Sequence, residues 1–210
     1  LAAVHWAAHG PEPTGENGDA SVIIMHAGSD DGVCAIMPGC STRKFHSSKR
    51  NAFQGINADP LGFISVGRNG NCEIEMDVQK PTRNIAAKPA VFDENARILQ
   101  LMAGPHLFAD QIKLASNYDA VLFHGTGLGH LPIEDPNGDS PENAEMREAV
   151  ANYCSKGGTA VMTSQCIHGP IHMDVYSKGR DQQDMGIVGN HATIGPDAAL
   201  VKLHFLLSIG

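Results

Sequence analysis

The stretch DAVLFHGTGLGHLPIEDPNGDSPENAEMREAVANYCSKGGTAVMTSQ, residues 119–165, contains the pattern that decides the fold. Two short apolar runs, DAVLFHG and TAVMTSQ, are typical of buried strands, and the segment SPENAEMREAVANYCSKGG between them is helical in its pattern. A strand, a helix and a second strand in this order form a crossover unit whose strands lie parallel in one sheet. The sequence therefore predicts an α/β fold with a parallel sheet.

The helix between these strands has recognisable ends. Ser140 is the expected N-cap, and Pro141 occupies the first helical position, where the missing N–H is not needed. Gly157 is expected to stop the helix, since glycine adopts the left-handed conformation that ends many helices. The predicted inward face consists of Met146, Val150 and Tyr153.

Similar segments lie on both sides of this unit. ARILQLM (96–102) predicts an earlier strand, and PHLFADQIKLAS (105–116) predicts the helix that follows it. PDAALVKLHFLL (196–207) predicts a last helix. Strands and helices thus alternate through a compact α/β domain that we place at residues 91–210.

The first 80 residues have a different pattern. LAAVHWAAHG predicts a helix that stops at Gly10, and SVIIMH and GVCAIM are strand-like runs. LGFISV and CEIEMDV flank Asn69-Gly70, a strong hairpin signal. We expect residues 1–80 to form part of a truncated domain and the polar, proline-bounded residues 81–90 to form a linker. Because the chain opens inside a helical pattern and without Met, we expect it to be a fragment.

Composition excludes several classes of protein. The formal net charge of −8 argues against a protein that coats nucleic acid, and nothing approaches the ~20 apolar residues of a membrane span. Five cysteines make an odd number without a CxxC pair, which favours reduced thiols and a cytoplasmic location.

Basic residues gather in STRKFHSSKR (41–50), despite the acidic character of the chain. In an extended segment Arg43 and Lys44 point to opposite faces, so one of them can lie in a site while the other meets solvent. A lysine near other cations, or partly desolvated, has a lowered pKa and can activate a hydroxyl nucleophile. From the pattern alone, a solvated basic loop and a phosphate-binding patch are also open.

Polar and small residues follow two of the predicted strands, in HGTGLGH (124–130) and TSQCIHG (163–169). Ligands of parallel sheets gather beyond the carboxyl ends of strands, where glycine allows close approach to the backbone. The alternative interpretation is that both segments are ordinary turns with a structural role only. The candidate substrate-binding residues are Gly125, Thr126, Gly127, Ser164 and Gln165.

These turns do not predict a cofactor or a metal. HGTGLGH has histidine at position 130, where the dinucleotide fingerprint GxGxxG needs its last glycine. Cys166, His168 and His172 form CxHxxxH, but no fourth ligand follows at a standard zinc spacing, and Pro170 interrupts the segment. We therefore expect no metal and no cofactor in this chain.

The run CSTRKFHSSKRNAFQGINADPL resembles the segment of L-asparaginase-type amidohydrolases that carries their active-site lysine. HGTGLGHLP, VMTSQCIHGPIHMDVYSKGR and DAALVKLHFLL are similar, in order and spacing, to one branch of that family, the D subunit of the archaeal glutamyl-tRNA(Gln) amidotransferase. The resemblance runs through nearly the whole chain. It implies the end of an N-terminal asparaginase-type α/β domain followed by a smaller C-terminal α/β domain with a parallel sheet.

The resemblance also implies a chemistry. A threonine attacks the side-chain amide of glutamine or asparagine, and water hydrolyses the acyl-enzyme, with a Thr-Asp pair and a lysine activating the nucleophile. Lys44 matches that lysine. The TGGT-type and GTDT-type motifs that carry the threonines are absent from these 210 residues, so we expect the chain alone to be inactive. The sequence also lacks the aromatic residue expected near His168, and the Arg and Asn expected near Pro170 and His172.

In the tRNA-dependent branch, ammonia passes to a partner subunit that uses ATP, and Mg with it, to convert glutamate on tRNA(Gln) into glutamine. The resemblance further implies a homodimer. Two other hypotheses remain. One is a free-standing asparaginase or glutaminase. The other is a module that binds a polyanion through Lys49 and Arg50. Against this last hypothesis, we expect the side chains of Lys49 and Arg50 simply to meet solvent.

Overall fold

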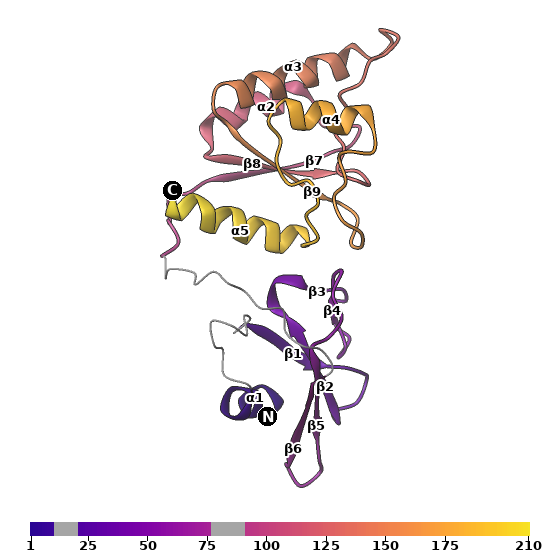
Figure 1. Cartoon of the computed structure of the whole chain (residues 1–210), viewed down its shortest axis with the longest axis vertical. Helices are drawn as coiled ribbons and strands as arrows, with labels where there is room; N and C mark the ends of the chain where they lie inside the picture. The colour runs from indigo at the N-terminus through magenta and orange to yellow at the C-terminus, as the bar shows by residue number, and fades with distance from the viewer. Residues whose placement is uncertain (11–20, 77–90) are drawn as a thin grey trace. The chain divides into compact units, whose positions relative to one another are not determined.

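The computed structural model describes residues 1–10, 21–76 and 91–210. The chain divides into two compact units, residues 1–89 and 90–210 (Figure 1). The predicted linker at residues 81–90 lies outside the described residues, so its role stays a prediction. Within the described ranges, none of the helices combines the length and the apolar character that crossing a bilayer requires.

In the described residues of the first unit, an α-helix lies beside an antiparallel sheet. The helix α1 covers Ala2–His9, as the sequence predicts. The described sheet has the order β1-β2-β5-β6, with every neighbouring pair antiparallel. Its strands are β1 (Val22–His26), β2 (Val33–Pro38), β5 (Gly62–Val66) and β6 (Cys72–Met76).

Apolar side chains join this helix to the sheet. Ala2 and Trp6 of α1 pack in one cluster with Ile36 of β2 and Ile64 of β5, and both isoleucines are fully buried. The β5–β6 hairpin turns at Gly70, whose φ of +83° is the left-handed conformation that Asn-Gly turns need. The hairpin prediction is confirmed.

A second, two-stranded sheet follows β2 in the chain. A short 3-10 turn, Gly39–Ser41, leads into β3 (Thr42–Lys44), which pairs antiparallel with β4 (Phe53–Gly55). The basic run therefore begins as a strand, and its remaining residues form the connection to β4.

The second unit is built on a parallel sheet of the order β7-β8-β9. Its strands are β7 (Ile98–Met102), β8 (Ala120–Gly125) and β9 (Thr159–Ser164), and both pairings are parallel. The three strands coincide with the three predicted apolar runs, so the α/β prediction is confirmed.

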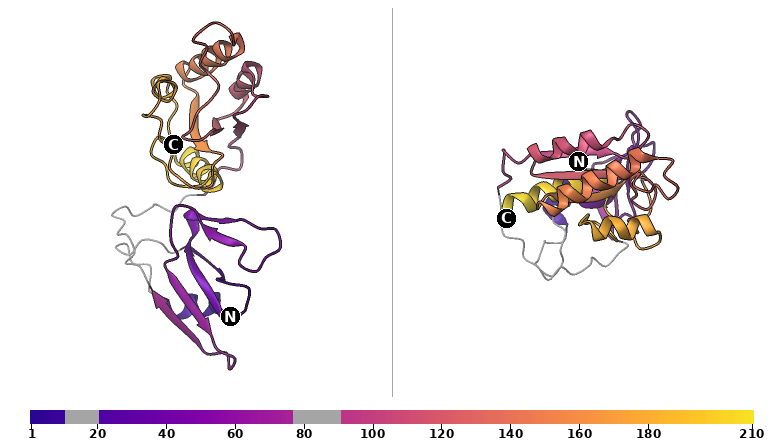
Figure 2. Two further views of the ribbon diagram at one scale, coloured as in Figure 1. Left: turned by 90° about the vertical axis from the view of Figure 1, so that its right-hand side faces the viewer. Right: turned by 90° about the horizontal axis from the view of Figure 1, so that it is seen from above.

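The central strand β8 is buried on both faces. Val121 and Phe123 pack with the core that includes Met146 and Val150 of α3 (Pro141–Ser155). The alternate residues of β8 pack against Ala199 and Leu203 of α5 (Pro196–Ile209). Figures 1 and 2 show α3 and α5 on opposite faces of the sheet. This three-layer arrangement explains why the strand reads as a continuous apolar run.

One helix boundary differs from the prediction, and the predicted N-cap residue of another helix lacks a side-chain cap bond. The helix expected at 105–116 is shorter: α2 covers Ala109–Lys113 and a 3-10 turn follows it at Leu114–Asn117. The side chain of Gln111 accepts the N–H of Phe108 at 2.8 Å, which fixes the start of α2 after that residue. Ser140 precedes α3 but makes no side-chain cap, and its own N–H donates to the Asp135 carboxylate at 2.9 Å.

The segment after β9 contains a helix that the sequence does not predict, α4 (Ser177–Asp184). The chain then returns to the sheet, where Val188 forms a parallel bridge beside Val161 of β9. The Met162 N–H donates to the Val188 carbonyl at 2.8 Å, and the Val188 N–H donates to the Ala160 carbonyl at 3.0 Å. The chain turns away at Gly189, whose φ is +118°.

Candidate active site

Lys44 is the last residue of β3, opposite Phe53 of β4. Its side chain is exposed, whereas Arg43 is half-buried, as expected for neighbours in a strand. The Lys44 Nζ lies 5.8 Å from the centre of the Phe53 ring, within the range of a cation–π contact. The hairpin therefore holds this amine at the surface of the first unit, where another group can reach it.

The rest of the basic run forms a local turn. The His46 Nδ1 accepts the backbone N–H of Ser48 at 3.1 Å and of Lys49 at 3.2 Å. Arg50 forms an ion pair with Asp31, a residue of the turn between β1 and β2. Arg50 is exposed, as expected, but the turn also brings a carboxylate beside it that the sequence does not predict.

The turn after β8 is closed by its own hydrogen bonds. The N–H of Thr126 donates to the His130 carbonyl, and the N–H groups of Gly129 and His130 donate to the Thr126 carbonyl, each at 3.0 Å. A Cβ on Gly125 would lie 2.8 Å from backbone atoms of Gly129 and His130. Glycine at 125 is thus needed for the packing of the turn itself, and these three N–H groups are not available to a ligand.

The end of β9 is joined to the same turn. The Ser164 hydroxyl donates to the Gly127 carbonyl at 2.6 Å and accepts the Cys166 N–H at 3.0 Å. The Gln165 side-chain amide donates to the carbonyls of Ala103 (2.6 Å) and His124 (2.9 Å), which lie at the ends of β7 and β8.

The structure thus brings the five predicted substrate-binding residues together at the carboxyl ends of the strands. The hydrogen bonds that Ser164 and Gln165 make here join the ends of the strands to one another. The contacts of the five residues with a substrate stay a prediction. Lys44, the predicted catalytic residue, belongs to the other unit.

A residue that sequence reasoning missed supports the turn after β8. The side chain of Gln182 in α4 is fully buried. Its carbonyl oxygen accepts the Leu131 N–H at 2.7 Å, and its amide donates to the Gly129 carbonyl at 2.8 Å. The neighbouring sequence SKGRDQQD is almost wholly polar, so no signal distinguishes this glutamine from exposed ones.

His130 closes the same turn and is 5% exposed. Its ring contacts Tyr176 edge to face, with 5.5 Å between ring centres, and its Nε2 has no hydrogen-bond partner among the described residues. Burial lowers the pKa of His130, and the Lys178 charge lowers it further. The folded protein therefore favours the neutral imidazole.

This environment predicts a pH dependence of stability. Since the folded pKa lies below the unfolded value of about 6.5, stability is full above that pH and falls as protonation begins to favour the unfolded chain. Denaturant unfolding between pH 7.5 and about 5 should show a shallower loss of stability in His130→Phe than in the unchanged protein. A His106→Phe control, at an exposed position, should keep the original slope, and equal slopes for all three proteins would contradict the assignment.

A pocket of about 440 Å³ lies at the other end of the sheet. Its walls include Asp119 and Gly158, which immediately precede β8 and β9. It therefore lies at the amino ends of these strands and does not belong to the turns described above.

The arrangement of the second unit has counterparts among known proteins. Residues 97–210, more than half of the chain, match the family model of the glutaminase/asparaginase C-terminal domain. The chain belongs to the glutaminase/asparaginase family. The matched region begins just before β7, so it contains the whole parallel sheet and both strand-end turns.

Relatives of this glutaminase/asparaginase chain extend the similarity into the first unit. The D subunit of glutamyl-tRNA(Gln) amidotransferase from Methanopyrus kandleri is 28% identical over 92% of this chain and 40% of its own length. The D subunit from Sulfolobus acidocaldarius is 33% identical over 89% of this chain and 39% of its own length. The chain therefore spans about two fifths of the length of these curated relatives.

Two solved L-asparaginase structures are similar in fold to most of this chain. The thermostable L-asparaginase from Thermococcus kodakarensis has a TM-score of 0.65 and 25% identity, covering 84% of this chain and 49% of that one. L-asparaginase I from Vibrio cholerae has a TM-score of 0.61 and 26% identity, covering 83% and 49%. The predicted asparaginase-type fold is confirmed by the family match and by these neighbours.

Proposed function

We propose that this chain is part of the glutaminase-type subunit of a tRNA-dependent amidotransferase. In the proposed reaction a threonine hydroxyl attacks the side-chain amide carbon of glutamine and ammonia leaves. Water then hydrolyses the acyl-enzyme to release glutamate. The coarser assignment, an amidohydrolase of the glutaminase/asparaginase family, follows from the family match.

One observation supports the tRNA-dependent branch. Similarity to the amidotransferase D subunit covers 92% of the chain in the Methanopyrus kandleri protein, so it extends across Lys44 as well as the second unit. The family model alone begins at residue 97 and does not contain Lys44. The similarity to this particular kind of subunit therefore rests on both units.

Lys44 is the proposed activating residue for the threonine. Its amine lies at the end of a strand, exposed and held beside the Phe53 ring, so a hydroxyl from another segment can approach it. The TGGT-type and GTDT-type motifs are not found in these 210 residues, so the proposed nucleophile and its Thr-Asp pair belong to a part of the protein outside them. Gly125, Thr126, Gly127, Ser164 and Gln165 remain the proposed substrate-binding group.

The released ammonia is proposed to pass to a partner subunit. That partner would hold ATP and Mg and would convert Glu-tRNA(Gln) into Gln-tRNA(Gln), while the present subunit pairs with a second copy of itself. All five cysteines are unpaired thiols, which agrees with a cytoplasmic location.

An amide-transfer assay tests this proposal against a free-standing asparaginase. The full-length protein that contains this chain, mixed with the ATP-using partner subunit, is expected to form Gln-tRNA(Gln) from Glu-tRNA(Gln) with glutamine as the amide donor. The assay follows the charged tRNA product after omission of glutamine, ATP or either subunit. Release of ammonia from free asparagine, without any transfer to tRNA, would support the free-standing enzyme instead. A module that binds a polyanion would show neither activity, only binding that weakens steeply with salt.

A further inference from the structure

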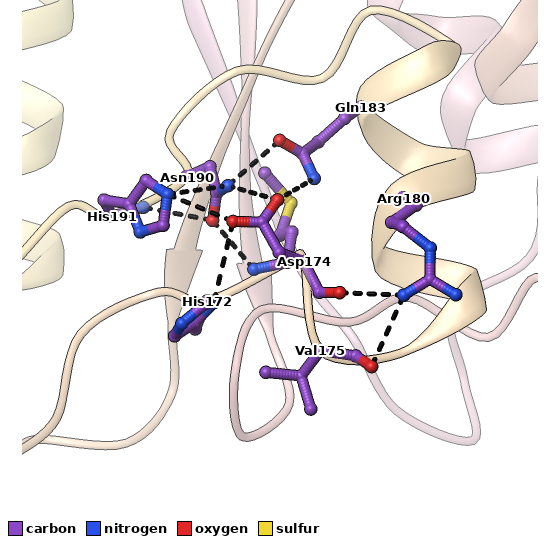
Figure 3. Close-up of polar contacts among 8 residues, drawn as sticks. His172, Asp174, Val175, Arg180, Gln183, Asn190 and His191 are labelled. Atoms are coloured by element: carbon purple, nitrogen blue, oxygen red, sulfur yellow. Dashed lines mark hydrogen bonds and ion pairs between the residues drawn. The ribbon is translucent and has the colours of Figure 1, made fainter.

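Two histidines and an aspartate converge on one point in the second unit. His172 and Asp174 lie in the segment between β9 and α4, and His191 follows α4 (Figure 3). Each offers one ligand atom, and the three atoms all lie within 4.8 Å of one another. The whole of α4 separates His191 from the other two along the chain, which is why the sequence gives no metal-binding spacing for them.

The bonds within this cluster leave one nitrogen unsatisfied. The Asp174 Oδ2 lies 3.1 Å from the His191 Nε2 and 3.8 Å from the His172 Nδ1. The His172 Nδ1 is buried and has no hydrogen-bond partner among the described residues. A single proton can join Asp174 to only one imidazole, whereas a cation between the three atoms would satisfy both nitrogens and the carboxylate at once.

Neighbouring side chains orient the carboxylate toward the imidazoles. The other oxygen of Asp174, Oδ1, accepts hydrogen bonds from the amides of Gln183 (3.0 Å) and Asn190 (2.9 Å). Arg180 donates to the backbone carbonyl of Asp174 at 2.7 Å, so its contact with this residue is with the backbone (Figure 3). Oδ2 is thus left facing the two histidines, as in metal sites whose ligands are held by an outer layer of hydrogen bonds.

The backbone also fixes the two segments together. The His191 N–H donates to the Ile171 carbonyl at 3.0 Å, and the Ile171 N–H donates to the Ala192 carbonyl at 2.9 Å. The Asn190 side chain accepts the Met173 N–H at 2.8 Å. His191 has a φ of +64°, a left-handed conformation that is uncommon for histidine. The backbone positions of the three ligand residues are therefore held by bonds within the protein.

We propose that His172, Asp174 and His191 form a binding site for a divalent transition-metal ion of the Zn²⁺ type. Imidazole nitrogen and carboxylate oxygen are ligands that this ion accepts, and three protein ligands plus solvent are a common arrangement. In a tetrahedral site with bonds of about 2.0–2.1 Å, ligand atoms lie about 3.4 Å apart. The separations of 3.1 and 3.8 Å from the Asp174 oxygen bracket that value, and all three ligand atoms lie within 4.8 Å, so side-chain rotation is needed to close the site around an ion.

The bound ion would have a structural effect. It would join the segment that leaves β9 to the segment that follows α4, two parts of the chain already linked by the hydrogen bonds of Asn190. The side chains of the three ligands are 44–65% exposed, so solvent can supply the remaining ligand. The His172 Nδ1 itself is buried, so the exposed His172 ring must turn for an ion to reach this atom.

Isothermal titration of the purified full-length protein that contains this chain with ZnCl₂ tests the site. The titrations should be done in a Cys40→Ser/Cys166→Ser background, because exposed thiols also bind zinc. We expect one tight site per chain and at least about a tenfold weaker affinity in His172→Gln and Asp174→Asn. Gln183→Ala, which removes an amide that donates to the Asp174 Oδ1, should weaken binding by about tenfold. MgCl₂ should not compete, because Mg²⁺ prefers oxygen ligands.

His106→Gln is the matched control, an exposed histidine in the same unit, and should bind Zn²⁺ like the parent. His191→Asn provides a second ligand variant if His172→Gln fails to fold, because asparagine tolerates the left-handed conformation at 191. Unchanged affinity in Asp174→Asn or His191→Asn, an equal loss in His106→Gln, or the lack of saturable binding would overturn the proposal. No outcome depends on amidase activity, so this test and that of the proposed function can fail separately.

Discussion

Lys44→Met in the full-length protein is expected to lower glutamine turnover by about 10²–10⁴-fold, the usual contribution of a general base. Methionine keeps an unbranched apolar side chain of similar length but has no amine to accept the proton of the threonine hydroxyl. Because Lys44 is exposed at the end of β3, its loss should leave the hairpin folded. Steady-state release of ammonia from glutamine measures the effect, with circular dichroism to follow folding. This expectation rests on the proposed function.

Two further variants distinguish the loss of a general base at Lys44 from the loss of a positive charge. Lys49→Met removes a positive charge from the same basic run and should keep a near-normal rate, since Lys49 is exposed in the turn that follows. Lys44→Arg keeps the charge but replaces the amine with a group that does not give up its proton, so it should be nearly as inactive as Lys44→Met. Near-normal turnover in Lys44→Met would remove Lys44 from the mechanism.

Gln182→Leu is expected to destabilise the second unit by about 2–4 kcal/mol. Leucine has a similar volume, so the cost comes from the two backbone groups that lose their partner, the Leu131 N–H and the Gly129 carbonyl. Both belong to the turn after β8 or the segment that leaves it, and the glutamine side chain is fully buried, so water does not replace it. Urea unfolding followed by circular dichroism gives the free-energy difference.

The matched control lies in the same helix. Asp184→Leu places the same apolar side chain at an exposed position of α4 and should change stability by less than about 0.5 kcal/mol. If Gln182→Leu is as stable as this control, the buried amide does not hold the turn, and another interaction must position Gly129.

The strands were predictable because burial on both faces leaves a simple pattern. Val121 and Phe123 contact one helical layer. Ala120 and Leu122, which alternate with them, contact the other, so this part of β8 is apolar on both faces. The helix α4 was not predictable, because nearly all of its residues are polar and one of its two buried residues is Gln182. Its contacts are with distant segments, and such tertiary contacts are invisible to local periodicity.

The candidate sites also depend partly on the order of elements, which the sequence shows, and partly on tertiary contacts, which it does not. Strand ends place Gly125 and Ser164 together, a juxtaposition that the order of elements predicts. Whether a side chain there meets substrate or holds the fold depends on its partners, and those of Ser164 and Gln165 became visible only in three dimensions. The cluster around Asp174 likewise depends on how the chain returns after α4.

The bridge at Val188 has a consequence for association between molecules. A strand with free N–H and carbonyl groups invites another chain to add to the sheet, a common beginning of aggregation. At the middle of β9, the Met162 N–H and the Ala160 carbonyl are already bonded to Val188. The chain then leaves the sheet at Gly189. A foreign strand cannot pair with these positions, so the protein blocks this part of the edge with its own backbone.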